Sequence, residues 1–304
     1  MSNRRIHRRA FLRRGSLVLA GAAIGAQSVS AADSKPNLRL GLVADLHYAD
    51  REPAGTRHHR ETIPKFREAA RCFQQEKVDA VIELGDIIDA ADSVDAERGY
   101  LKRVVQEFTA VPGKHHYVLG NHCVWSLTKA EFLEVIGHKE SYYSFDLGGH
   151  HFVVLDACFR KDGEPYGRKN NEWTDANIPA AEVEWLRADL QRTDKKTVVF
   201  VHQCLDVVPP YGIQNAAEVR KALEQSGKVL AVFQGHYHKG GYRRIGGIHY
   251  CTLAAMIESK ETNAYSIMEV LPGGKIRIQG SGRQAGYDWI TSAPAEQSRH
   301  PRRT

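Results

Sequence analysis

The stretches LRLGLVADLH (residues 38–47) and VDAVIELGDIID (residues 78–89) decide the fold of this chain. Each opens with a short run rich in Val, Ile and Leu, which is typical of a buried strand, and ends in polar residues. Three later runs are similar, because each is short, largely apolar and followed at once by Gly or His. We therefore predict five buried strands, at residues 38–44, 78–84, 116–119, 197–201 and 229–234.

Segments with the apolar spacing of amphipathic helices lie between these strands, at residues 66–73 and 100–108. A third helix is predicted from Pro179 to Leu190, with the proline near its first turn. Strands that alternate with helices predict an α/β sheet covered on both faces. Two hairpins are also predicted, one from 142–147 to 151–155 around Gly148-Gly149 and one from 264–271 to 275–279.

The composition is that of a soluble globular domain, since 42% of the 304 residues are hydrophobic and 26% are charged. Six of the 42 basic residues lie within residues 1–31, where no acidic residue occurs. The remaining basic residues equal the 36 acidic ones in number, so the body of the chain is neutral. A protein that binds a nucleic-acid polymer needs a basic surface, and we therefore expect no such partner. Residues 36–290 are predicted to form one domain, and residues 293–304 a disordered, solvated tail.

The first 31 residues have the layout of a secretory signal. A basic segment with the pair Arg8-Arg9 precedes an apolar stretch at residues 16–26, and Val29-Ser30-Ala31 matches a cleavage signal. The paired arginines resemble a twin-arginine signal. We predict that residues 1–31 are cleaved, that the protein is exported to the periplasm or beyond, and that no stable membrane anchor remains. A membrane anchor or a basic arm is the alternative interpretation.

Polar residues follow every one of the five predicted strands. In open α/β folds ligands bind beyond the carboxyl ends of the strands, so these residues are expected to converge on one crevice. They are carboxylates, imidazoles and one amide, which suit manganese, iron or zinc better than calcium. Asp86 is well placed to bridge two ions, because a carboxylate has two oxygens. The clusters are Asp45-Leu46-His47, Gly85-Asp86 with Asp89, Gly120-Asn121-His122, His202 and Gly235-His236-Tyr237-His238.

Taken in order, these clusters read DxH, GDxxD, GNH, a lone His and GHxH, and this pattern resembles the calcineurin-like metallophosphoesterase family. The resemblance extends over most of the chain. It implies that residues 36–290 form a four-layer αββα sandwich, in which two mixed sheets are flanked by helices. It also implies two bound divalent or trivalent metal ions, of Mn, Fe or Zn. One ion would be bound by Asp45, His47, Asp86 and His238, and the other by Asp86, Asn121, His202 and His236.

The same resemblance gives His122 a catalytic role outside the ligand set. Its imidazole would stabilise the transition state or protonate the leaving oxygen, with Asp89 orienting the ring. One departure from the family pattern is Cys123, which stands where an acid is expected. Since that position is not among the ligands, we expect the replacement to alter the properties of the site without abolishing activity.

Within the family, the wider likeness is to manganese-dependent ADP-ribose/CDP-alcohol diphosphatases. We therefore expect hydrolysis of phosphodiester or pyrophosphate bonds in small nucleotide-type substrates through a metal-bound hydroxide. A broad-specificity exported phosphomonoesterase is the alternative, because substrate choice depends on loop shape. A binding module that has lost catalysis would have lost ligands, and every ligand position is filled here. The supporting stretches are residues 85–89, 141–145, 153–156 and 240–242.

Several further residues have a less specific pattern. Arg57 and Arg60 could bind a phosphate group, but two arginines that flank a histidine pair are more typical of a solvated loop. Trp125, Tyr211 and Asn215 follow predicted site loops and could face a base or sugar, with packing as the expected role of Trp125.

The remaining histidines and the cysteines are expected to be structural. The five cysteines show no CxxC spacing, so no disulfide framework is predicted, although one pair could form after export. The mechanism requires no thiol nucleophile, so neither Cys123 nor Cys204 is expected to be one. Surface or packing positions are expected for His58, His59, His115, His116, His150 and His151.

Overall fold

The computed structural model describes residues 12–13, 16–17, 35–272 and 274–289, and the chain divides into two units, Met1–Asp33 and Ser34–Thr304. In the first unit the short strands β1 (Leu12–Arg13) and β2 (Ser16–Leu17) pair antiparallel. Most of the predicted signal peptide (1–31) and the whole predicted tail (293–304) lie outside the described residues, so both stay predictions.

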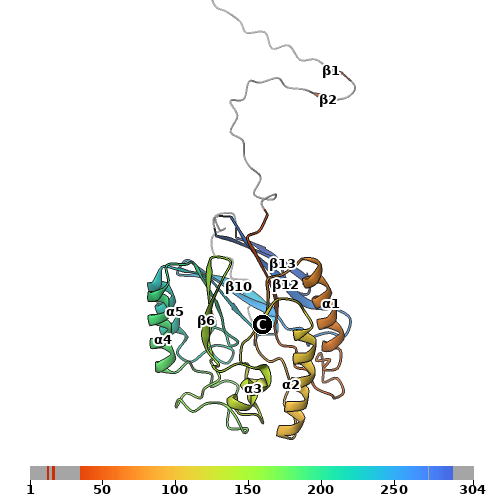
Figure 1. The fold of residues 1–304 in the computed structure, drawn as a ribbon, viewed down its shortest axis with the longest axis vertical. Coiled ribbons are helices and arrows are strands. Elements are labelled where there is room, and N and C mark those ends of the chain that lie inside the picture. Colours follow the sequence, from red (N-terminus) through yellow and green to blue (C-terminus); the bar gives the residue numbers. More distant parts are fainter. Residues whose placement is uncertain (1–11, 14–15, 18–34, 273, 290–304) are drawn as a thin grey trace, which may run out of the picture. The chain divides into compact units, whose positions relative to one another are not determined.

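Two six-stranded mixed sheets form the centre of the second unit (Figure 1). The first has the order β14-β13-β12-β3-β4-β5, and its strands β3, β4 and β5 run parallel. The second has the order β10-β11-β9-β8-β7-β6, with only the outer strands antiparallel to their neighbours. The first comprises β3 (Leu38–Val43), β4 (Ala80–Glu83), β5 (Lys114–Tyr117), β12 (Ala264–Leu271), β13 (Lys275–Gly282) and β14 (Tyr287–Asp288). The second comprises β6 (Tyr143–Leu147), β7 (His150–Val154), β8 (Thr197–Phe200), β9 (Val229–Gln234), β10 (Lys239–Ile245) and β11 (Ile248–Ala254).

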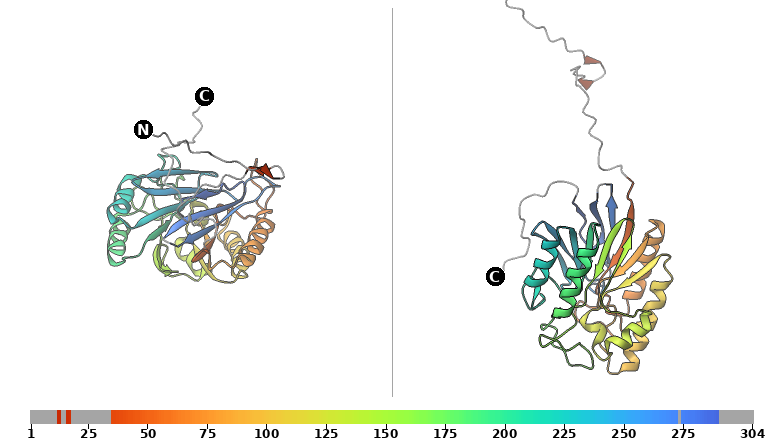
Figure 2. Two further views of the ribbon diagram at one scale, coloured as in Figure 1. Left: turned by 90° about the horizontal axis from the view of Figure 1, so that it is seen from above. Right: turned by 60° about the vertical axis from the view of Figure 1, so that its left-hand side comes forward.

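Helices cover the outer face of each sheet. The helices α1 (Thr62–Gln75) and α2 (Val94–Thr109) lie on one side of the sheets, and α4 (Ala180–Arg192) and α5 (Ala216–Ser226) on the other (Figures 1 and 2). A 3-10 turn, η2 (Asn121–Val124), and the short helix α3 (Lys129–Ile136) follow β5.

Three buried clusters explain these layers, because alternate residues of a strand face opposite sides. On β3, Leu40 and Leu42 point into the cluster between the two sheets, which also holds Phe152 and Phe200 of the second sheet. Val43 belongs instead to the cluster beneath α1 and α2. A third cluster lies between the second sheet and the helices α4 and α5.

The predicted four-layer αββα sandwich is confirmed. The expectation from strand and helix alternation alone was less accurate, because each sheet has helices on one face and the other sheet on its second face. The inner faces of both sheets are apolar, and each is buried by packing against the other sheet. Helices are therefore needed only on the outer face of each sheet. Both predicted hairpins are present, as β6–β7 and β12–β13.

Several elements differ from the sequence prediction, among them the strands β10, β11 and β14, which were not predicted. Neither α3 nor α5 was predicted, although α3 begins with a capping box formed by Thr128 and Glu131. The strand expected at 116–119 ends at Tyr117, because the chain then leaves the sheet to form η2. Among the helices that the structure describes, none has the length and apolar character needed to cross a membrane.

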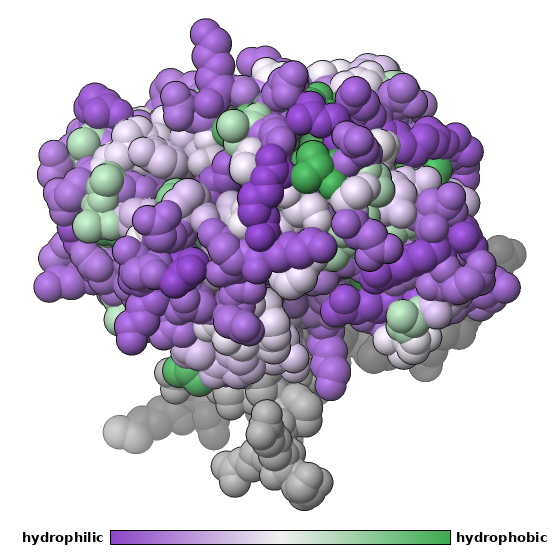
Figure 3. Space-filling view, turned by 90° about the horizontal axis from the view of Figure 1, so that it is seen from below, coloured by the Kyte–Doolittle hydropathy of each residue, from purple (hydrophilic) through white to green (hydrophobic). Residues whose placement is uncertain are grey.

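Few large hydrophobic side chains remain at the surface. In the part of the chain that the structure describes they are Trp173, Val208 and Tyr211, with 41%, 81% and 37% of their surface exposed. Figure 3 shows one face of the molecule, on which hydrophilic residues dominate and hydrophobic residues form small separate patches. The three exposed side chains lie in two loops, at residues 171–176 and 206–214, which border the site described next.

Candidate functional site

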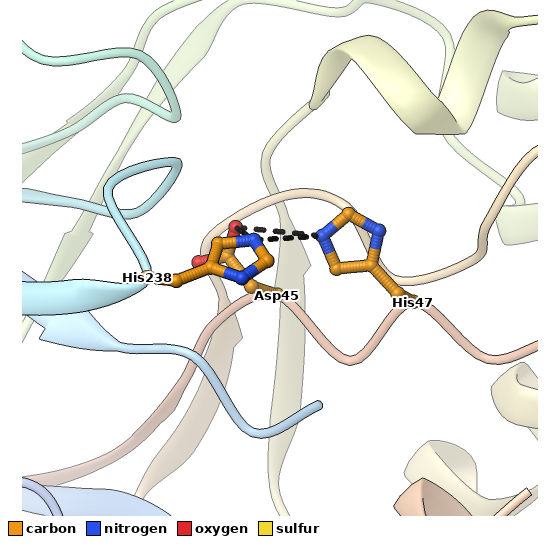
Figure 4. Close-up of side chains that lie close together, drawn as sticks. All are labelled: Asp45, His47 and His238. Carbon is orange, nitrogen blue, oxygen red and sulfur yellow. Dashed lines mark hydrogen bonds and ion pairs between the residues drawn. The ribbon is translucent and has the colours of Figure 1, made fainter. Parts of the chain in front are cut away.

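Asp45, His47 and His238 form the first group of candidate metal ligands. The first two follow β3, and His238 lies between β9 and β10, so both sheets contribute. His47 Nε2 lies 3.2 Å from His238 Nε2 and 3.8 Å from Asp45 Oδ1. Figure 4 shows the three side chains pointing toward one another. Their ligand atoms therefore surround a common point, as a metal site requires.

Asp86, His202 and His236 form the second group. They follow β4, β8 and β9, and Asp86 Oδ2 lies 3.1 Å from His202 Nε2. The same oxygen lies 3.5 Å from His47 Nε2 of the first group. His202 donates from Nδ1 to the carbonyl of Leu84 at 2.8 Å, which leaves Nε2 facing the carboxylate. Asp86 thus lies between the two groups, where a bridging ligand would stand.

Four buried atoms of the predicted ligand residues have no hydrogen-bond partner among the described residues: His47 Nδ1, Asn121 Oδ1, His202 Nε2 and His236 Nε2. Of these residues, Asn121 is 4% exposed and His236 is 8% exposed. Leaving a buried polar atom unpaired costs about 1–3 kcal/mol, so such atoms call for a ligand. An amide oxygen and an imidazole nitrogen beside carboxylates fit a transition-metal ion.

The charges of the site are mutually supporting. Burial would raise the pKa of the Asp86 carboxyl, but nearby imidazoles, His202 foremost, hold it well below its ordinary value. Burial would lower the pKa of the His47 imidazole, yet the carboxylates around it raise this pKa to about 10. By contrast, burial and His202 lower the pKa of His236 to about 3, so its ring is neutral at pH 7. Binding of metal ions would replace protons in this cluster.

The ligand positions depend on unusual backbone geometry. Non-glycine residues rarely adopt a positive φ, because Cβ then meets the carbonyl oxygen, and such strain clusters at functional sites. Glycines allow close approach as well: a Cβ on Gly120 would lie 2.2 Å from Asp86 Oδ1. Positive φ values occur at Asp45 (53°), His47 (44°), Asp86 (56°) and His236 (66°).

His122 and Asp89 lie beside the metal groups as a hydrogen-bonded pair. His122 Nδ1 is 2.5 Å from Asp89 Oδ1, and the His122 side chain is 27% exposed while that of Asp89 is 1% exposed. Burial would raise the pKa of Asp89, but His122 and His47 hold it well below its usual range. The carboxylate is therefore charged and orients the ring, which lines the cavity. His47, Asp89 and His122 also form a third set with metal-ligand spacing.

A cavity of about 430 Å³ opens over the two groups. Its walls include Arg57, which was expected in a solvated loop, and Trp125, for which packing was expected and substrate contact was the alternative. Tyr211, which was considered for contact with a substrate, lines it too, together with Trp173, which the sequence did not single out. Arg60 instead pairs with Asp50 and Glu52 at the surface.

Asn215, which was considered for substrate contact, has a structural role. Its side chain accepts a hydrogen bond from the backbone N–H of Ile178 at 3.1 Å and donates one to the carbonyl of the same residue at 2.8 Å.

Cys123 is buried in η2, and burial raises the pKa of its thiol well above the ordinary value. A protonated, enclosed thiol is a poor nucleophile. All five cysteines are unpaired.

Three residues near the site have no sequence signal. Arg51 pairs with Oδ2 of Asp89, whereas His122 pairs with Oδ1. His59 was expected to be a surface or packing residue and is fully buried, with Nδ1 3.0 Å from the carbonyl oxygen of His47. Glu258 pairs with His238 at 2.7 Å. None lies in a motif, and their proximity to the site depends on how the loops fold.

The other histidines that were expected to be structural lie outside the three candidate metal groups. They are His58, His115, His116, His150 and His151.

Comparison with known proteins agrees with this geometry. The family described as calcineurin-like phosphoesterase matches residues 38–240. A manganese-dependent ADP-ribose/CDP-alcohol diphosphatase of Oryza sativa subsp. japonica is 26% identical over 84% of this chain and 95% of its own length. The protein of the same name from Arabidopsis thaliana is 26% identical over 86% and 99%. The crystal structure of a dimetal phosphatase from Danio rerio shares the fold, with a TM-score of 0.75 and 24% identity over 85% of this chain and all of that one.

Proposed function

The chain belongs to the calcineurin-like phosphoesterase family, and we propose that it hydrolyses phosphodiester or pyrophosphate bonds in small nucleotide-type substrates. It is a metal-dependent phosphoesterase of the dimetal type. Two ions in such a site supply a water of lowered pKa and neutralise charge on the phosphoryl oxygens. Manganese is the proposed native metal, because the relatives named above are manganese-dependent and the oxygen and nitrogen ligands suit it.

The ligand groups and His122 have separate proposed tasks. Asp45, His47 and His238 would hold one ion, and Asn121, His202 and His236 the other, with Asp86 shared between them. His122 stands at the cavity wall with Asp89 holding its ring, where it can give a proton to the leaving oxygen.

The observation that carries the nucleotide-type substrate is an aromatic pair at the mouth of the cavity. The rings of Trp173 and Tyr211 lie 5.4 Å apart, at 5.7 and 5.9 Å from the ring of His236. Exposed aromatic rings this close to the ligands offer a nucleobase a stacking surface, worth about 1–3 kcal/mol per base. The phosphates of the same molecule would then lie over the metal groups.

The loops that carry the two rings are joined to each other. Gln214 donates from its side chain to the carbonyl of Thr174 at 2.9 Å and from its backbone to that of Ala176 at 2.8 Å. The surface is therefore formed before a ligand arrives, which lowers the entropic cost of binding.

A substrate panel tests the proposal. We expect kcat/KM with added Mn²⁺ to be higher for ADP-ribose than for bis-p-nitrophenyl phosphate or p-nitrophenyl phosphate. Trp173→Ala should lower kcat/KM for ADP-ribose by roughly 5- to 150-fold, which is the stacking energy expressed as a rate ratio. Val208→Ala, an exposed change in the same pair of loops, is the matched control. A preference for the monoester would favour the phosphomonoesterase alternative.

We also propose that the protein is exported through a twin-arginine route, on the sequence of residues 1–31. Replacing Arg8 and Arg9 by Lys should leave the precursor inside the cytoplasm, as measured by fractionation of the cells. Unchanged export of that variant would favour a general secretory signal.

A further inference from the structure

The segment that follows β11 runs directly beside the predicted metal ligands. The backbone N–H of Ala255 donates to the carbonyl of His238 at 3.0 Å, and that of Ile257 to the carbonyl of Asp45 at 3.0 Å. We call residues 255–259 the support segment. Its backbone is thus bonded to two residues of the first ligand group, one from each sheet.

The side chain of Glu258 reaches from this segment to His238. Glu258 Oε1 lies 2.7 Å from His238 Nδ1, with the two side chains 19% and 16% exposed. A carboxylate at this distance holds the proton on Nδ1 and leaves the lone pair on Nε2. That nitrogen faces Asp45 Oδ1 at 3.6 Å, within the first ligand group. Glu258 therefore selects the tautomer and the ring orientation that a metal ligand needs.

A buried lysine holds the support segment in place. Lys65 is 6% exposed, and its Nζ donates to the carbonyls of Met256 at 2.9 Å, Glu258 at 3.1 Å and Ser259. On the other side, Ser259 donates from its backbone to the carbonyl of Thr56 at 2.9 Å. An ammonium group has three N–H donors, so Lys65 can bond all three carbonyls at once. The segment is thereby held from two directions, and the position of the Glu258 carboxylate is restricted.

We infer that Glu258 is a positioning residue, which sets the metal affinity of the first ligand group through His238, and that Lys65 holds Glu258 in place. Neither residue lies in a motif of the family pattern. The inference rests on the predicted ligand role of His238, and it concerns metal binding and not the choice of substrate. A failure of the substrate proposal would appear in the substrate panel and leave the metal measurements below unchanged.

Calorimetric titration of metal-free protein with Mn²⁺ tests the inference. Glu258→Ala should weaken one of two binding events by about 10–100-fold and leave the other unchanged. Glu258→Gln keeps an acceptor oxygen and should retain more of the affinity. Glu261→Ala, an exposed change three residues further along, is the matched control and should change neither event. Equal weakening of both events, or no weakening, would overturn the inference.

A double-mutant cycle separates positioning from general damage to the fold. If Glu258 acts through His238, then Glu258→Ala should change the Mn²⁺ affinity no further in a protein that already carries His238→Ala. A further loss in that background would show that Glu258 acts by another route, and the inference would be wrong. If His238→Ala leaves both binding events intact, the ligand assignment fails and the inference fails with it. Lys65→Met should weaken the same event as Glu258→Ala, and that loss should also vanish when Glu258 is already Ala.

Discussion

Asp86 is the residue on which both ligand groups depend. One of its oxygens lies within 3.5 Å of an imidazole nitrogen in each group, and the carboxylate is charged because the surrounding imidazoles lower its pKa. No other residue of the site stands between the two groups in this way. Its negative charge is therefore shared by both groups, while its other oxygen accepts a hydrogen bond from the backbone N–H of His122 at 2.8 Å.

Asp86→Asn is predicted to reduce hydrolysis to the background level. The amide keeps the size of the side chain but loses the negative charge that would hold two cations together. Elemental analysis should find about two Mn ions per chain in the wild type and fewer in the variant. Asp92→Asn, at an exposed position on the same loop, should retain both metal and activity. Full activity in a metal-free preparation would refute the dinuclear site.

His122→Ala is predicted to lower kcat by roughly two to four powers of ten without loss of metal. The ring is hydrogen-bonded to Asp89 and does not complete either principal ligand group, so its removal should affect the leaving oxygen. The loss should be larger for alkoxide leaving groups than for p-nitrophenolate, which needs little help from an acid.

Asp89→Asn should give a milder form of the same defect, because the ring loses the charged partner that orients it. Steady-state rates over a series of leaving groups, with metal content measured in parallel, check both variants. Equal losses for all leaving groups would instead favour a role for His122 in phosphate binding. Loss of metal would make His122 a ligand.

At the scale of elements, the junctions between strands and loops place the ligands. The chain turns sharply after β3, β4 and β9, and the ligand residues there adopt positive φ values that cost stability. Gly85 leaves room for the His202 ring from the second sheet, and Gly120 for the Asp86 carboxylate after the adjacent strand β4. These turns bring the carboxyl ends of strands from two sheets within ligand distance of each other.

Gly120→Ala is predicted to disrupt the site through steric overlap. The added Cβ would lie 2.2 Å from Asp86 Oδ1 and 2.3 Å from the backbone N of the same residue, so the Asp86 carboxylate must move. Overpacking of this kind costs about 1–3 kcal/mol, and metal binding should fall as well. Chemical denaturation and Mn²⁺ titration measure the two effects.

Gly99→Ala is the matched control for that substitution. It lies within α2 with nothing near the added Cβ, and should stabilise the protein by about 0.5–1 kcal/mol. A Gly120→Ala protein with wild-type metal affinity would show that the junction tolerates the displacement.

At the scale of the whole molecule, the candidate metal site lies where the ends of the two sheets meet. Asp45, His47 and Asp86 come from the first sheet, and His202, His236 and His238 from the second. Hydrogen bonds link these loops, for example from His236 N to Asp45 Oδ1 at 3.1 Å and from His202 Nδ1 to the carbonyl of Leu84 at 2.8 Å. Metal ions would add a strong connection between the layers.

Removal of metal is therefore predicted to lower the melting temperature, and added Mn²⁺ to raise it in a concentration-dependent way. A ligand at 100 times its Kd stabilises the folded state by about 2.7 kcal/mol per site. Differential scanning calorimetry with EDTA and with graded Mn²⁺ measures the effect. A melting temperature that does not respond to either would contradict a site shared between the sheets.

The sequence by itself determined the buried strands, the helices at 66–73 and 100–108, and the chemical types of the site residues. Runs of Val, Ile and Leu indicate strands, and apolar residues spaced with a 3.6-residue period indicate helices. Both patterns are local, so they can be recognised without knowledge of the tertiary contacts. The order of the motifs then led to the four-layer fold, which is confirmed. The short helix α3 was missed because its single apolar turn gives little periodicity, although its capping box was readable.

Only the tertiary structure decided which sheet each strand joins and which side chains surround the ligands. Trp173, Arg51 and Glu258 reach the site from loops that carry no periodic pattern, so their positions depend on contacts far away in sequence. The buried Lys65, for example, holds a segment more than 190 residues later through three carbonyl groups. Contacts at that separation form because burial of three apolar clusters fixes the layers, and no local preference of the chain encodes them.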